Sequence, residues 1–143
     1  MKMKKAIALA VLCLAPALAA AEERPWSNGP VTAVTYVKVK AGKFDDYMAY
    51  LGVAYRKQME ASMKAGLVSN WHVYTTQARN PNEPDLILTV TYPNMGTLDK
   101  QKEFDAVATS VSGPIAEMNK GFADRSSMRE VLGGDLIREV ILR

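Results

Sequence analysis

Residues 31–77 constrain the fold of this 143-residue chain more than any other stretch. Apolar and polar residues alternate over 31–40 and again over 67–77, which is the period of a strand with one buried face. Between these segments, residues 43–65 place apolar side chains three and four positions apart, as on the buried side of a helix about six turns long. The stretch therefore predicts a strand, a helix and a second strand, in that order.

A third alternating segment, residues 86–92, follows a loop rich in Asn and Pro. We expect it to form an antiparallel hairpin with the strand at 67–77. The register that keeps like faces together makes four cross-strand pairs: Trp71 with Val90, Val73 with Leu88, His72 with Thr89, and Asn70 with Thr91. One face of the predicted sheet is then apolar, and the other is polar and aromatic.

The C-terminal half predicts two helical stretches and a last strand. Asn94 is a good N-cap for a helix that ends at the break at 113–114, Gly-Pro. A further helical stretch begins at Ile115 and is predicted to end at the glycine pair 133–134. Residues 136–142 predict the last strand, and its charged residues suit a position at the sheet edge.

The predicted order of elements is that of the βαββαβ ferredoxin-like fold with one additional helix. This is an α+β fold with an antiparallel sheet and helices on one face. The folded domain is predicted to span 31–143, and residues 22–30 are predicted to be a polar lead-in outside the regular structure. The sheet face that the helices leave open carries aromatic and polar residues, so we expect a second subunit to cover it.

The N-terminal segment, residues 1–21, is predicted to be a signal peptide. Three lysines precede the apolar run 6–14, and small residues follow Pro16. Cleavage after Ala19 or Ala21 satisfies the small-x-small rule. An uncleaved membrane anchor is the alternative, but the run is shorter than the roughly 20 residues that span a bilayer. The protein is therefore expected to be periplasmic or secreted, with no stable membrane anchor after leader cleavage.

Charge and composition exclude several classes of function. The chain has 18 basic and 15 acidic residues, and the leader holds three of the basic ones and no acidic one. The remaining 15 basic and 15 acidic residues lack the basic excess of a nucleic-acid-binding protein. Cys13 is the one cysteine and lies in the leader, and His72 is the one histidine. A metal site built from several Cys or His residues is therefore excluded, and no metal or cofactor is expected.

Residues 36–51, YVKVKAGKFDDYMAYL, resemble the beginning of proteins of the dimeric α+β barrel superfamily. This superfamily includes NIPSNAP-like proteins and the small monooxygenases of antibiotic biosynthesis, in which two ferredoxin-like subunits pack sheet against sheet. The resemblance implies a homodimer. Its members range from cofactor-free oxygenases and isomerases to haem enzymes and proteins without known activity, so the resemblance implies no single reaction.

His72 is the candidate catalytic residue. It could act as a general base or orient a phenolic or carbonyl substrate. The alternative, which we favour because no carboxylate partner is placed beside it, is a histidine bonded to Thr89 within a subunit interface. As the axial ligand of a haem it would have an unusual position, on a strand. The residues expected to line a ligand pocket beside His72 share its sheet face: Tyr36, Asn70, Tyr74, Thr89 and Thr91.

The long helix offers a second candidate pocket. Its stripe of Tyr and Met could enclose an aromatic or lipid-like ligand between helix and sheet, although such a stripe more often forms the core. Tyr50 lies off the stripe and is predicted to face solvent or a contact.

Two functions are compatible with these residues. The first, which we prefer, is an exported, non-enzymatic homodimer that binds a small apolar or aromatic ligand. The alternative is a cofactor-independent monooxygenase or isomerase acting on an aromatic or polyketide-like substrate, with His72, Tyr36 and Tyr74 lining its site. The sequence contains no G-x-S-x-G motif, phosphate-binding loop or dinucleotide fingerprint.

Overall fold

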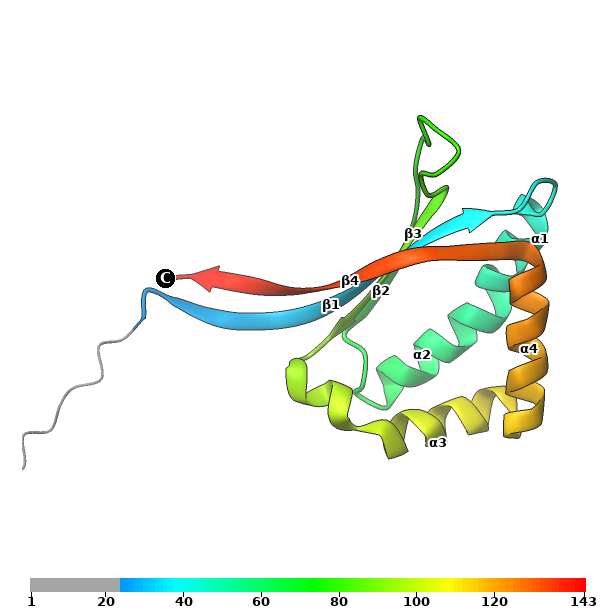
Figure 1. Ribbon diagram of the computed structural model, residues 1–143. Coiled ribbons are helices and arrows are strands. Elements are labelled where there is room, and N and C mark those ends of the chain that lie inside the picture. Colours follow the sequence, from blue (N-terminus) through cyan, green and yellow to red (C-terminus); the bar gives the residue numbers. More distant parts are fainter. Residues whose placement is uncertain (1–23) are drawn as a thin grey trace, which may run out of the picture.

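The computed structural model describes residues 24–143, and the predicted signal peptide lies outside this part of the chain. The described residues form a four-stranded antiparallel sheet in the order β2-β3-β1-β4, with the helices packed on one face (Figure 1). This confirms the predicted ferredoxin-like α+β fold. The elements are β1 (Trp26–Val39), α1 (Phe44–Tyr50), the π-helical turn η1 (Leu51–Tyr55), α2 (Arg56–Lys64), β2 (Asn70–Thr75), β3 (Leu86–Tyr92), the 3-10 turn η2 (Met95–Asp99), α3 (Gln101–Ser112), α4 (Ile115–Met128) and β4 (Arg129–Leu142).

The core lies between the central strands and α1. Val37 of β1 and Leu86 of β3 are fully buried, and Tyr47 of α1, which is 1% exposed, packs against them with Leu51. All of these residues come from the apolar faces that the two sequence periods predict. Burial of this set against water is the main force that holds the helices on the sheet.

The predicted hairpin register is confirmed for all four pairs. Trp71 lies on the helix side of the sheet, where its ring meets the edge of Tyr55, with 5.7 Å between ring centroids. His72, the next residue along β2, therefore points to the opposite, open face. The apolar pattern of the two strands was sufficient to predict this, because a slip of one residue would exchange the two faces.

The predicted helix at 43–65 is present as three consecutive segments. α1 begins one residue later than predicted, has Asp45 and Asp46 in its first turn, and continues through η1 into α2. The acidic residues stabilise the positive end of the helix dipole. The π-helical turn was not predicted, because apolar spacing does not distinguish a wider turn within a helix. Such turns are frequent at functional sites.

The prediction that residues 22–30 form a lead-in outside the regular structure is wrong for 26–30. β1 begins at Trp26, and its first residues pair with the end of β4, Trp26 opposite Leu142. The turn-like sequence Asn28-Gly29-Pro30 coincides with a shift of register between Asn28 and Val31. A bulge accommodates a proline, which has no N–H to donate to the ladder, so the strand continues through a segment that resembles a loop.

The prediction that a helix ends at the glycine pair 133–134 is also wrong. α4 ends at Met128, and β4 begins at Arg129 rather than at residue 136. The glycines lie inside β4, beside a second register shift: the neighbouring residues Tyr36 and Val37 of β1 pair with Gly133 and Val131, so Leu132 of β4 is the extra residue. Their composition resembles a helix stop, but Gly134 allows β4 to approach the backbone of Val34 closely, and Gly133 has a positive φ of 149°. The predicted edge position of the last strand is confirmed.

Gly134→Ala is expected to destabilise the protein by roughly 1 to 3 kcal/mol, because overpacking displaces backbone. A Cβ at this position would overlap the backbone oxygen of Val34 on the neighbouring strand. Gly52→Ala is the matched control, since a Cβ there meets open space within a helical segment. Urea unfolding of both variants measures the difference. An unchanged midpoint for Gly134→Ala would contradict this account of the β1–β4 contact.

β1 and β4 extend together as a two-stranded arm beyond the helices (Figure 1). In the arm, apolar side chains of β4 are exposed on both faces, with Ile141 46% and Val140 52% exposed. An isolated two-stranded ribbon is marginally stable in water. Among residues 24–143, no helix has the length and apolarity needed to cross a membrane.

Candidate functional site

The sheet face opposite the helices brings together all six residues predicted for the site. They occupy three adjacent rows that run across the four strands. In strand order β2, β3, β1, β4, the rows are Asn70, Thr91, Thr32, Ile137; then His72, Thr89, Val34, Asp135; then Tyr74, Ile87, Tyr36, Gly133. The predicted common face of these residues is therefore confirmed, whereas their role in binding stays a prediction.

His72 is held by its neighbour on the same strand. The Asn70 side-chain oxygen Oδ1 accepts a hydrogen bond of 2.9 Å from the Trp71 backbone N–H, which orients the amide. The amide nitrogen Nδ2 then lies 3.0 Å from His72 Nε2 and donates to it. In a neutral imidazole whose Nε2 accepts, the proton is on Nδ1. The hydrogen bond of His72 is thus to Asn70 and not to Thr89, the partner expected from the sequence.

This geometry does not favour His72 as a general base. Its Nε2 lone pair is already engaged by Asn70, and the remaining ring nitrogen carries a proton. The ring lies 5.6 Å from that of Tyr74, which is 50% exposed. The ring planes are tilted by 42°, so the two rings form an angled aromatic surface with one N–H donor, which can contact an apolar or aromatic ligand.

Tyr36 is fixed in the same way. Its hydroxyl donates a hydrogen bond of 2.9 Å to the carboxylate Oδ2 of Asp135 on β4. This bond and the charge of Asp135 raise the pKa of Tyr36 above its usual value, so the phenol stays protonated. Asp135 was missed by the sequence prediction, because β4 was predicted to begin at 136. In the first row, the hydroxyls of Thr32 and Thr91 lie 2.9 Å apart and bond to each other.

Within the described residues, no three His, Cys, Asp or Glu side chains lie close enough together to hold a metal ion. The open face instead offers aromatic rings, hydroxyl groups and a carboxylate whose positions are set by hydrogen bonds. Such a face can recognise a partner or a ligand by shape and by a few polar contacts.

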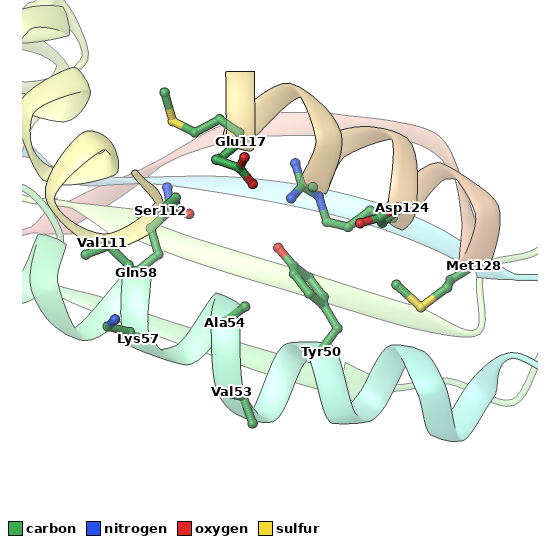
Figure 2. Close-up of a pocket in the computed structure, with 13 residues that line it drawn as sticks. Tyr50, Val53, Ala54, Lys57, Gln58, Val111, Ser112, Glu117, Asp124 and Met128 are labelled. Atoms are coloured by element: carbon green, nitrogen blue, oxygen red, sulfur yellow. The ribbon is translucent and has the colours of Figure 1, made fainter. Parts of the chain in front are cut away.

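The structure also contains a cleft of about 550 Å³ on the helix side, away from the open face. The cleft lies between the α1–η1–α2 segment and the corner formed by α3 and α4, not between helix and sheet as the predicted pocket would. Figure 2 shows Tyr50 projecting from α1 toward α4, which carries Glu117 and Asp124. None of the lining residues belongs to the predicted site: they are Tyr50, Val53, Ala54, Lys57, Gln58, Val111, Ser112, Glu117, Met118, Gly121, Asp124, Arg125 and Met128.

Of the two environments predicted for Tyr50, solvent or a contact, the structure shows the contact. Tyr50 is half-buried, and its ring stacks on that of Tyr47 with 5.8 Å between centroids and 15° between planes. The stripe residue Tyr47 is in the core, in agreement with the preferred interpretation of the stripe. The cleft was missed because it depends on the turn at Gly113, whose φ of 79° directs α4 back across α1. Residue spacing gives no information about that angle.

Comparisons with known proteins support the fold. No protein-family model matches this chain, and a comparison with curated protein sequences also gave no match. The structure is similar to that of HapK from Hahella chejuensis, with a TM-score of 0.50 and 12% identity over 76% of this chain and 91% of that one. It is also similar to protein SO0527 from Shewanella oneidensis (TM-score 0.49, 12% identity, 81% and 98% covered) and to an EthD-like protein from Ralstonia eutropha (TM-score 0.39, 10% identity, 80% and 91% covered). At such low identity, the similarity to HapK supports a ferredoxin-like α+β fold and shows nothing of activity.

Proposed function

We propose that two copies of this chain pack their open sheet faces together, and that the dimer holds a small apolar or aromatic molecule between the sheets. The observation that carries the proposal is the composition of the uncovered face. Ile137 is 54% exposed and Tyr74 50% exposed on a surface that also carries Tyr36 and His72. Large exposed apolar groups on one continuous face mark an interaction surface.

The size of this face is sufficient for a stable interface. With about 4.8 Å between strands and about 3.3 Å per residue, four strands of the observed lengths, the arm included, cover a plane of about 650 Å². A standard interface buries about 800 Å² of accessible surface per partner, and accessible surface exceeds plane area wherever side chains protrude. A dimer that used the whole face, including the arm, would therefore reach the usual range.

The polar groups favour binding over catalysis. The hydroxyl of Tyr36 donates to Asp135, and the Nε2 lone pair of His72 accepts from Asn70. Residues fixed in this way keep their positions when a ligand arrives, which lowers the entropy lost on binding. Between two such sheets, a planar ligand would contact the aromatic rings on both sides. The oxygenase or isomerase alternative, with His72 as general base, requires a free imidazole nitrogen, and the Nε2 lone pair of His72 is engaged by Asn70.

The composition of residues 1–21 supports export as part of this proposal. N-terminal sequencing of the protein recovered from the cell envelope or medium tests it. A first residue at 20 or 22 is the expected result, and a chain retaining Met1 would contradict it.

Native mass spectrometry of the protein purified without denaturant is expected to give a dimer with the mass of a bound small molecule. Tyr74→Ala is expected to lower the occupancy of that molecule, because it removes the exposed ring beside His72. Ile115→Ala, at a residue 69% exposed at the start of α4 on the helix side, is the matched control and should retain the ligand. A monomer, or a dimer whose ligand occupancy does not change in Tyr74→Ala, would contradict the proposal.

A further inference from the structure

The helix-side cleft contains an arginine that is held in place but not neutralised. The Arg125 guanidinium lies over two aromatic rings, 5.5 Å from the centroid of Tyr50 and 5.7 Å from that of Phe122. None of the ion pairs formed among residues 24–143 includes Arg125. Because the aromatic rings cover the planar face of the Arg125 guanidinium, the N–H groups at the edge of that plane can still donate hydrogen bonds.

A second arginine adds positive charge directly behind the cleft. Arg129 follows the lining residue Met128, and its guanidinium lies 5.7 Å from the centroid of Tyr47, the ring that stacks on Tyr50. Its Nε is buried and makes no hydrogen bond within the described part of the chain. Burial raises the pKa of Tyr47, and Arg129 and Arg125 both act against that rise, which shows that both charges reach the stacked pair. Two cations therefore share one aromatic stack without a bonded carboxylate.

The charges around the cleft limit the charge of an occupant. Lys57 and Arg125 are basic lining residues, and Glu117 and Asp124 are acidic ones on the exposed surface of α4. When Arg129 is counted with these four residues, the positive charges exceed the negative charges by one. A single negative charge on the occupant balances this set, whereas a dianion such as a phosphate monoester would meet repulsion from Glu117 and Asp124.

Apart from Gln58 and Ser112, the remainder of the cleft wall is mostly apolar. Val53 and Ala54 come from the π-helical turn, and Met118 and Met128 come from α4 opposite. Methionine side chains adapt their shape to aliphatic or aromatic groups. The volume of about 550 Å³ lies within the usual range of small-molecule sites.

We propose that this cleft binds a small organic acid with one carboxylate and an apolar body. The carboxylate accepts hydrogen bonds from the edge of the Arg125 guanidinium, and the apolar body lies between the π-helical turn and the two methionines of α4. The site is separate from the sheet face and does not depend on the dimer proposed above.

Isothermal titration of the protein with octanoate and with 2-naphthoate tests this site, with 1-octanol as the uncharged control. We expect at least one of the two acids to bind at least about 10-fold more tightly than octanol, because hydrogen bonds to a charged donor are among the stronger ones. Arg125→Met keeps the length of the side chain and removes the charge, and it is expected to reduce the affinity for the acid to that for octanol.

Two further variants test whether the acid binds in the cleft. Ala54→Trp fills the cleft and leaves Arg125 unchanged, so it should abolish binding of the acid even if Arg125→Met perturbs the packing of α4. Ile115→Ala, at an exposed residue outside both the cleft lining and the open sheet face, should leave the affinity unchanged. The proposal is wrong if neither acid binds at millimolar concentration, if octanol binds as tightly as the acids, or if the acid binds Ala54→Trp as tightly as the unchanged protein.

Discussion

Ile137→Glu is expected to convert the proposed dimer into monomers. The side chain lies on the open face, in the same row as Thr32 and Thr91, and is 54% exposed in the single chain. In a dimer that packs sheet against sheet it becomes buried, and an unpaired carboxylate there loses its hydration without gaining a partner. We expect the dimer dissociation constant to increase at least about 100-fold, which corresponds to about 3 kcal/mol.

Sedimentation equilibrium over a range of protein concentrations measures this change. Ile115→Glu is the matched control, because Ile115 is 69% exposed at the start of α4 on the helix side. A glutamate there faces water and lies near the positive end of the helix dipole, so the dimer should be unaffected. Equal dissociation constants for the two variants would rule out the open face as the interface.

Leu86→Ala is expected to lower the free energy of unfolding by roughly 2 to 5 kcal/mol, the usual range for a buried leucine. Leu86 is fully buried in β3 and contacts the cluster that includes Val37 and Tyr47. Removing its outer carbons loses their transfer free energy and leaves a cavity that neighbours on two rigid strands fill poorly. This is a large share of the stability of a single domain of this size.

Chemical unfolding of Leu86→Ala and of Ile115→Ala provides the comparison. Both variants lose a comparable number of carbon atoms, but Ile115 is mostly in water, so its loss should change stability by no more than about 0.5 kcal/mol. Both measurements should be made at one protein concentration, because a dimer makes the apparent stability depend on concentration. Similar losses in the two variants would contradict the placement of Leu86 at the centre of the core.

The sequence predicted correctly those features that depend on the two-residue period of a strand or the 3.6-residue period of a helix. Alternation placed Trp71 under the helices and His72 on the open face, and it fixed their pairing with Val90 and Thr89. The face of a side chain is set by its parity along a strand, so a short window of sequence is enough. The long helix was predicted to within one residue at each end of the segment from Phe44 to Lys64 for the same reason.

The strand boundaries were predicted wrongly at two segments whose composition is typical of turns but whose tertiary contacts hold them in strands. Asn28-Gly29-Pro30 and the glycine pair 133–134 have the composition of turns, yet both lie within strands that pair with each other. Their extended conformation is stabilised by a partner about 100 residues away in the chain, which a local window does not include. Asp135 was missed together with them, and with it the carboxylate that fixes Tyr36.

The sequence by itself determined the order of strands and helices, the faces of the sheet and the group of residues around His72, because each depends on the spacing of side chains along a few turns or a single strand. Only the tertiary structure decided that β1 and β4 continue as an arm, that His72 is bonded to Asn70, and that Arg125 lies over Tyr50 beside a cleft. Those features depend on the angles at which separate elements meet. Such angles result from packing of the whole chain, which no local period encodes.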